Sequence, residues 1–100
     1  MPPIEQVPAS EWQTWLEANE AMLLDVREQE EWDLGTLPDA VRISIGDIPG
    51  RLGDLTGKDG VLVVCRSGAR SQQVAVFLSM NGVTNVANLA GGMKALGLQD

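Results

Sequence analysis

The residue types that could do chemistry in this chain of 100 residues gather in one segment, Cys65-Arg66-Ser67-Gly68-Ala69-Arg70-Ser71. Cys65 is the single cysteine, and the chain contains no histidine. An internal disulfide, a Cys–His dyad, a Ser–His–Asp triad and an imidazole-bound metal are therefore excluded. We expect no metal and no other cofactor, which leaves a nucleophilic thiolate at Cys65 as the chemistry of this segment.

The residues after Cys65 favour its thiolate form. The small residues 67–69 allow the backbone to curl so that successive N–H groups face inward and bind negative charge. A helix behind them adds the positive end of its dipole, about half an elementary charge, and the guanidinium groups of Arg66 and Arg70 complete the anion site. We expect the pKa of Cys65 to lie below the ~8.5 of a free cysteine. The alternative is a small apolar side chain that closes a strand beside two solvated arginines, but the combined pattern favours the thiolate.

Strands and helices alternate along the sequence that positions this segment. Short apolar runs predict strands at residues 4–7, 22–26, 41–45, 61–65 and 86–89. Apolar periodicity and end signals predict helices at residues 11–19, 28–34, 70–80 and 93–98. Proline and glycines allow at most a weak helix at residues 48–55. Ser10 and Gln13 have the spacing of a capping box at the first helix.

This alternation predicts an α/β fold, one domain over residues 1–100 with a small, mostly parallel sheet of about five strands and helices on both faces. The run 61–65 is uninterrupted and β-favouring, which is typical of a central strand buried on both faces. Such sheets bind ligands beyond the carboxyl ends of their strands. Cys65 ends the central strand, so we expect the active site at that edge.

Asp25 and Arg27 leave a neighbouring strand at the same edge. They can support the Cys65 loop or contact the substrate directly, and the supporting role is favoured. A third interpretation is local: Asp25 caps the helix that follows, and Arg27 pairs with a surface acid such as Glu30 or Glu31.

Charge narrows the set of partners. The formal net charge of −7 argues against nucleic acid and anionic membranes, because both need clustered Lys and Arg. Ten acidic residues lie in residues 1–39, whereas no carboxylate side chain occurs between Asp59 and Asp100, where an anion would be repelled least. No apolar run approaches the ~18 residues of a membrane span, and the chain start has no targeting pattern. We expect a soluble, cytoplasmic protein in a reducing compartment.

Four groups of residues stand in order along the chain: Leu24-Asp25-Val26-Arg27-Glu28, Glu31-Trp32 with Gly35, Val63-Val64-Cys65-Arg66-Ser67-Gly68-Ala69-Arg70-Ser71, and Asn88-Leu89-Ala90-Gly91-Gly92-Met93. Together they resemble the landmarks of a single-domain, rhodanese-like sulfurtransferase. The resemblance implies that Cys65 takes a sulfane sulfur from a donor such as thiosulfate as a persulfide and passes it to cyanide or a thiol. Arg66 is similar to the basic residue after the cysteine in thiosulfate-using members. The chain departs from the usual family pattern at residues 35–40 and at Leu96, where tryptophan is usual.

Three other functions stay open. A persulfide carrier module would be loaded and unloaded by partner proteins. A cysteine phosphatase or arsenate reductase can use a related fold, but the loop between Cys65 and Arg70 is one residue shorter than theirs and fits sulfur better than a tetrahedral phosphoryl group. A non-catalytic interaction domain is disfavoured by the intact loop. For the enzyme we expect a small anionic sulfur donor, a thiol or cyanide acceptor, and a monomer.

Overall fold

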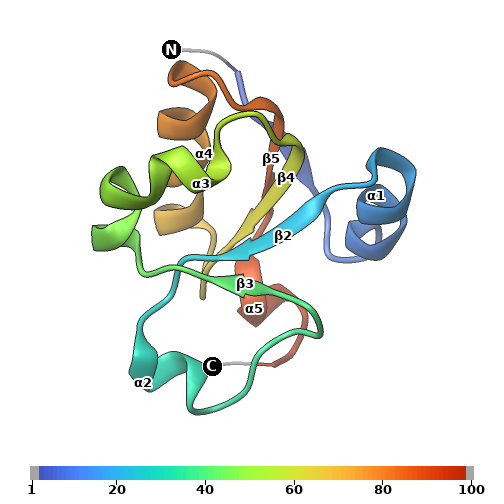
Figure 1. The fold of residues 1–100 in the computed structure, drawn as a ribbon. Coiled ribbons are helices and arrows are strands. Elements are labelled where there is room, and N and C mark those ends of the chain that lie inside the picture. Colours follow the sequence, from blue (N-terminus) through green and yellow to red (C-terminus); the bar gives the residue numbers. More distant parts are fainter. Residues whose placement is uncertain (1–2, 99–100) are drawn as a thin grey trace.

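The computed structural model describes residues 3–98, in which strands and helices alternate (Figure 1). The strands are β1 (Glu5–Val7), β2 (Met22–Asp25), β3 (Val41–Arg42), β4 (Asp59–Val64) and β5 (Thr84–Leu89). The α-helices are α1 (Trp12–Asn19), α2 (Gln29–Trp32), α3 (Leu52–Leu55), α4 (Ala69–Met80) and α5 (Gly92–Ala95). Two short 3-10 helices, Ile45–Asp47 and Pro49–Arg51, precede α3.

The five strands form one parallel sheet in the order β1-β5-β4-β2-β3. This confirms the predicted α/β fold and places β4 at the centre, as expected from its apolar run. Residues 61–64 of β4 are each 0% exposed. In the strand register Val64 lies opposite Asp25 of β2, and Val63 lies opposite Asn88 of β5. The carboxyl end of β4 is therefore flanked by one acidic residue and one amide residue.

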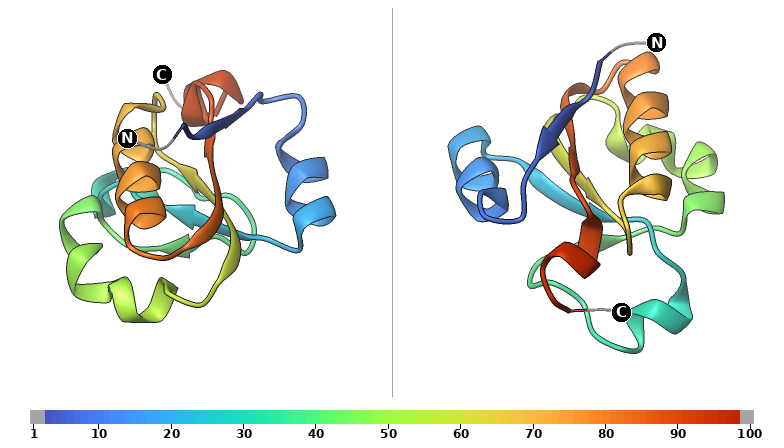
Figure 2. Two further views of the ribbon diagram at one scale, coloured as in Figure 1. Left: turned by 90° about the horizontal axis from the view of Figure 1, so that it is seen from above. Right: turned by 180° about the vertical axis from the view of Figure 1, so that it is seen from behind.

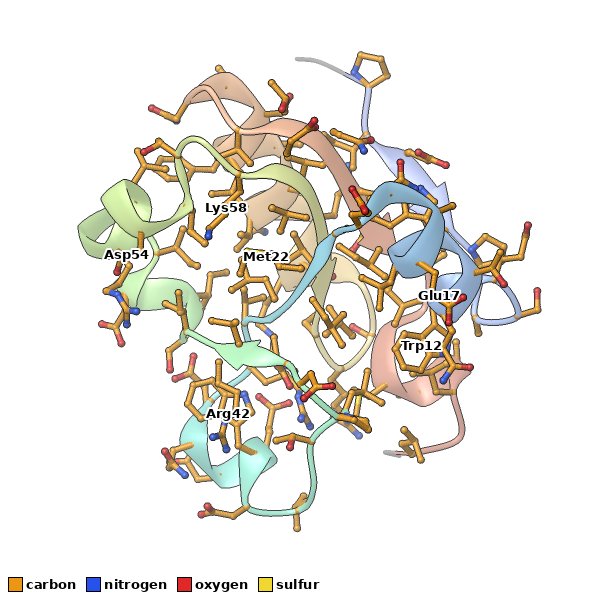
Figure 3. All side chains as sticks on the ribbon, turned by 45° about the vertical axis from the view of Figure 1, so that its right-hand side comes forward. Trp12, Glu17, Met22, Arg42, Asp54 and Lys58 are labelled. Atoms are coloured by element: carbon orange, nitrogen blue, oxygen red, sulfur yellow. The ribbon has the colours of Figure 1, made fainter. Side chains whose placement is uncertain are left out.

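Helices cover both faces of the sheet. Figure 2 shows α3 and α4 on one side of the sheet and α1 on the other. On the first side, Val61 and Val63 pack with Val74 and Leu78 of α4. On the second side, Leu62 and Val64 pack with Met93 of α5 and with partly buried side chains of α1, among them Trp12, which lies beside α5 in Figure 3. Alternate residues of β4 thus face two separate apolar clusters, which is why the whole strand is apolar.

The first helix begins differently from the prediction. It starts at Trp12 after Glu11 and has no side-chain cap, so the predicted capping box of Ser10 and Gln13 is wrong. The physical reason is a turn just before the helix, in which the Glu11 N–H donates to the Pro8 carbonyl at 2.9 Å. Ser10 lies inside that turn.

No helix within residues 3–98 is long and apolar enough to cross a membrane.

Candidate active site

Cys65 directly follows β4 at the carboxyl edge of the sheet. The residue is buried, with 1% of its surface exposed. Three loop residues then lead into α4, whose N-cap is Gly68. The fold thus brings the thiol to the place that the sequence predicts for the site.

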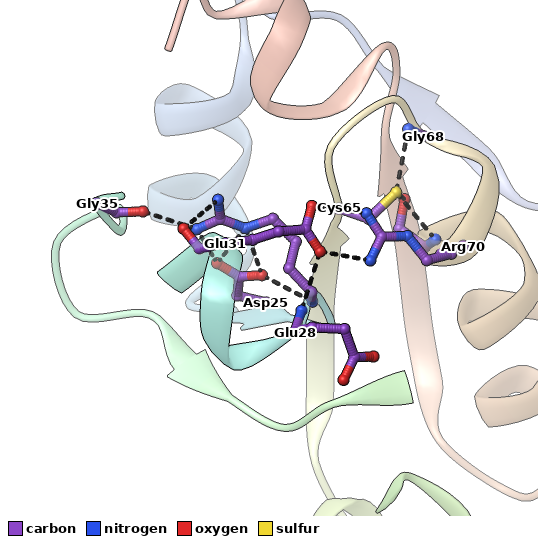
Figure 4. Close-up of polar contacts among 9 residues, drawn as sticks. Asp25, Glu28, Glu31, Gly35, Cys65, Gly68 and Arg70 are labelled. Carbon is purple, nitrogen blue, oxygen red and sulfur yellow. Dashed lines mark hydrogen bonds and ion pairs between the residues drawn. The ribbon is translucent and has the colours of Figure 1, made fainter. Parts of the chain in front are cut away.

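The sulfur of Cys65 accepts three hydrogen bonds from the start of α4. The N–H of Gly68 lies 3.1 Å from Sγ, the N–H of Ser71 lies 3.3 Å away, and the Ser71 hydroxyl lies 3.2 Å away; Figure 4 shows the bond from Gly68. Burial raises the pKa of the thiol, but the bonds from the Ser71 hydroxyl and the loop amides outweigh burial, so the net effect lowers the pKa of Cys65. This direction agrees with the expectation, although the hydroxyl of Ser71 contributes more than the sequence indicated.

Gly68 makes the tight turn in front of α4 possible. Its φ of +100° lies in the left-handed region, which favours glycine. A Cβ at this position would lie 3.1 Å from the backbone nitrogen of Gly91. Ser67 and Ala69 on either side are exposed. Gly68 therefore sets the direction of the N–H group that binds the sulfur.

The start of α5 braces the loop from behind. The N–H groups of Met93 and Lys94 donate to the carbonyls of Cys65 and Arg66 at 2.9 and 3.0 Å. Gly92 has a φ of +59°. A Cβ at this position would lie 2.6 Å from the carbonyl oxygen of Arg66 and would also clash with the carbonyl oxygen of Cys65. With the loop carbonyls bound on this side, the loop N–H groups are free to face the sulfur.

The two arginines of the loop have different surroundings. Arg66 is exposed and forms no ion pair with any residue from 3 to 98. Arg70 is the second residue of α4, and its guanidinium donates to the two carboxylate oxygens of Glu31 at 2.7 and 2.9 Å (Figure 4). The stretch between Asp59 and Asp100 contains no carboxylate side chain in the sequence. In the structure, however, α2 places the carboxylate of Glu31 against it.

Glu31 links α2 to the loop. Its Oε1 also accepts the backbone N–H of Glu28 at 3.0 Å, as one half of the capping box that starts α2. The hydrogen bond from Arg70 outweighs burial and, with the Glu28 N–H and the charges of Arg70 and Arg27, lowers the pKa of Glu31 to about 2. The same contact raises the pKa of Arg70. The pair is thus fully ionised at neutral pH.

Asp25 and Arg27 form a buried ion pair beside β4. Arg27 Nη2 lies 2.8 Å from Asp25 Oδ2, and the Asp25 carboxylate also accepts the Arg27 Nε–H and backbone N–H at 3.0 Å. The guanidinium further donates to the carbonyls of Gly35 at 2.8 Å and Glu31 at 3.3 Å. The local interpretation is wrong: the N-cap of α2 is Glu28, and the carboxylate paired with Arg27 is that of Asp25. Both residues are 0% exposed, and their support of the loop stays a prediction.

Comparison with protein families identifies the chain. The model of the rhodanese-like domain matches residues 8–98. The chain belongs to the rhodanese-like family.

Relatives and solved structures agree with this membership. YtwF of Bacillus subtilis is 39% identical over 93 residues, which cover 92% of this chain and 89% of that protein. A sulfurtransferase of Allochromatium vinosum is 35% identical over 79 residues, covering 79% of this chain and 74% of that protein. The crystal structure of a rhodanese-like domain protein from Staphylococcus aureus has a TM-score of 0.82 at 31% identity, covering 92% and 90% of the two chains. The relatives support sulfur transfer as the general activity of this rhodanese-like chain.

Two residues of the rhodanese-like site were not predicted as site residues from the sequence. Glu31 binds Arg70, and its signal was the Glu28-x-x-Glu31 spacing of a capping box. Asn88 is buried, and its Oδ1 lies 2.5 Å from the Ser71 hydroxyl. Its signal was an amide inside the apolar run 86–89, since a buried polar side chain needs a partner.

Proposed function

We propose that this chain is a sulfurtransferase that moves a sulfane sulfur from a small anionic donor such as thiosulfate, through a persulfide on Cys65, to cyanide or a thiol. We further propose that residues 1–100 act as one rhodanese-like domain, as a monomer and without a metal or other cofactor. A single free thiol suits a reducing, cytoplasmic compartment.

The observation that carries the proposal is the sulfur of Cys65 with its three hydrogen-bond donors. All three donors are neutral groups, held in place by α4 and by the glycine turn. Such donors stabilise a negative charge at the sulfur and need little reorganisation during reaction. They lower the pKa of the thiol, so a nucleophile is available without a general base.

Loading of the enzyme with sulfur needs no proton and no reactant other than the donor. The Cys65 thiolate attacks the outer sulfur of thiosulfate, a new S–S bond forms, and the S–S bond of the donor breaks with sulfite as leaving group. The charge of −1 on the enzyme is kept, now on the outer sulfur of the persulfide. Cyanide then attacks that outer sulfur and leaves as thiocyanate, which restores the thiolate.

Arg66 is the residue that we assign to the encounter with the donor. It is exposed, and its guanidinium forms no ion pair with residues 3–98. Its charge is therefore available to an incoming dianion. Arg70 is engaged by Glu31, so its role in this proposal is to hold the loop and to add positive potential near the sulfur.

The intact mass of the protein tests the proposal. After incubation with thiosulfate the wild type should gain the mass of one sulfur atom, and cyanide should remove it. Cys65→Ser should abolish both this adduct and all thiocyanate formation, with an unchanged circular dichroism spectrum. An adduct on the Ser variant would contradict the assignment, because the chain has no other thiol. Aryl phosphates should stay unhydrolysed, and a phosphatase activity lost in Cys65→Ser would favour the phosphatase instead.

A carrier module is the second candidate, and a relative supports it. YrkF of Bacillus subtilis, which carries the name of a sulfur carrier protein, is 35% identical over 72 residues, covering 72% of this chain and 39% of that protein. A carrier would form the same Cys65 persulfide from a protein donor. Rapid sulfur exchange with a cysteine desulfurase, together with slow turnover of thiosulfate, would identify it.

A further inference from the structure

A chain of neutral side chains runs from the Cys65 sulfur to β1, on the β5 side of the loop. The Ser71 hydroxyl lies 3.2 Å from Sγ and 2.5 Å from Oδ1 of Asn88. Asn88 Nδ2 donates to Gln6 Oε1 at 2.9 Å, and Gln6 Nε2 donates to Gln72 Oε1 at 2.6 Å. Ser71 is 0% and Asn88 3% exposed, so both are closed off from solvent.

The orientation of the Asn88 amide follows from its other contacts. Its Nδ2 faces two acceptors, the Gln6 side-chain oxygen at 2.9 Å and the Gly68 carbonyl at 3.3 Å. Oδ1 must therefore face the Ser71 hydroxyl, as an acceptor. A hydroxyl carries one proton, whereas Ser71 has two acceptors within reach, a sulfur and an amide oxygen. Ser71 cannot satisfy both at once.

We propose that Asn88 is a positioning residue: it offers the Ser71 hydroxyl a second acceptor and so decides in which states of Cys65 that hydroxyl donates to the sulfur. When Sγ is a thiolate, the hydroxyl donates to Sγ and Asn88 Oδ1 loses its donor. When Sγ is a thiol, the S–H can donate to the Ser71 oxygen while the hydroxyl proton turns to Asn88. The change needs a rotation of the hydroxyl, and the one proton that leaves is the thiol proton, which goes to solvent.

Asn88 therefore stabilises the states in which Sγ itself carries no charge. The thiol is one of them. The persulfide is another, because its charge lies on the outer sulfur; this second part rests on the proposed function. Asn88 thus makes the thiolate less stable relative to the persulfide. The three hydrogen bonds to the sulfur therefore do not stabilise the free thiolate so strongly that loading with sulfur becomes unfavourable.

Charged groups near the loop also influence the Cys65 thiol. They are unchanged in every Asn88 variant, because none of them is bonded to Asn88. They are Arg66 and Arg70 on the loop and α4, Glu31 on α2 with its N-cap Glu28, Lys94 on α5, and the Asp25–Arg27 pair at the end of β2. None of them contacts Asn88 through a hydrogen bond or ion pair between residues 3 and 98. A substitution at Asn88 therefore measures the effect of the Ser71 hydroxyl on Cys65 separately from the effect of these charges.

The rate of iodoacetamide alkylation against pH tests this inference without any sulfur donor. Asn88→Ala should lower the midpoint of Cys65 by about one pKa unit or less, the size of one neutral hydrogen bond. Ser71→Ala should raise the midpoint. In the Ser71→Ala background the Asn88→Ala change should have no effect, because Asn88 acts through the hydroxyl. Gln6→Ala, which removes one contact of the Asn88 amide nitrogen, serves as the control and should shift the midpoint less.

A raised midpoint in Asn88→Ala, or the same shift with and without the Ser71 hydroxyl, would overturn the inference. If Asn88→Ala does not fold, Asn88→Leu fills the same space without a hydrogen-bond acceptor and carries the same expected direction. A second measurement uses the loaded protein: at a fixed ratio of thiosulfate to sulfite, Asn88→Ala should lower the ratio of persulfide to free enzyme by a similar factor. If no persulfide forms in the wild type, the proposed function fails while the alkylation result still stands.

Discussion

The two sides of the Cys65 loop are built from different chemistry. On the β2 side, two ion pairs, Asp25–Arg27 and Glu31–Arg70, join β2, α2 and α4. On the β5 side, neutral hydroxyl and amide groups lead from the sulfur towards β1. A buried ion pair keeps one fixed geometry, because separating its partners would leave an uncompensated charge inside the protein. A neutral hydroxyl can change its acceptor without leaving a charge uncompensated, and so can follow the charge of the sulfur.

The charged side is itself graded by burial. The side chains of Arg27 and Asp25 are 1% and 0% exposed, whereas those of Arg70 and Glu31 are 31% and 20% exposed. Water screens the second pair more than the first. The first pair should therefore matter most for stability, and the second for how α2 is attached to the loop.

The largest expected effect is that of breaking the buried pair. Asp25→Ala leaves the guanidinium of Arg27 buried without its carboxylate, which should cost about 3–5 kcal/mol of unfolding free energy. The control is Asp54→Ala, which breaks an exposed pair with Arg51 whose side chains are 51% and 63% exposed. That change should cost less than about 1 kcal/mol. Urea unfolding of both variants compares them, and equal losses would show that burial does not set the value of the Asp25–Arg27 pair.

A smaller effect, with a distinct pH dependence, is expected for Glu31→Gln. The pKa of Glu31 is lowered to about 2 in the folded protein, against about 4.3 in an unfolded chain. The stabilisation by its carboxylate is therefore present above the unfolded value and is lost as the pH falls from about 4 to about 2. At neutral pH the variant should be less stable than the wild type by about 1–3 kcal/mol, between the values for exposed and buried pairs.

Urea unfolding at neutral and acidic pH measures this difference. The gap between wild type and Glu31→Gln should shrink as the pH falls through that window. Glu30→Gln, on the same helix but with an exposed side chain and no ion pair among residues 3–98, is the matched control. A gap that stays constant down to pH values near 2 would mean that the carboxylate charge of Glu31 does not stabilise the fold.

The same contrast explains what could be predicted from sequence. Residues 61–64 are apolar without interruption, and this pattern requires a strand covered on both faces, so the central strand and the position of Cys65 follow directly. The turn at Gly68 follows from small residues ahead of a helix. Both depend on residues that are close in sequence.

The partners of the loop depend on contacts that are distant in sequence. Arg70 and Glu31 are 39 positions apart, and Asn88 and Gln6 are 82 positions apart. The order of the strands in the sheet, β1-β5-β4-β2-β3, decides which of these side chains meet, and charge counting along the chain cannot do so. The missing carboxylates after Asp59 therefore gave a misleading picture of the potential at the loop, because α2 brings Glu31 into it.

The smallest and most specific effect is expected for Arg66, the loop arginine that neither side holds in an ion pair. Arg66→Ala should raise KM for thiosulfate about two- to fivefold, the value of one exposed charge contact, and leave kcat unchanged. Salt should lower the wild-type kcat/KM by screening the same attraction and should affect the variant less. Arg51→Ala removes an equal charge from an exposed site on the chain and should leave KM unchanged. If Arg66→Ala instead lowers kcat at constant KM, Arg66 acts on the transfer step rather than on the encounter with an anionic donor, and loading by a protein partner becomes the better account of how sulfur reaches Cys65.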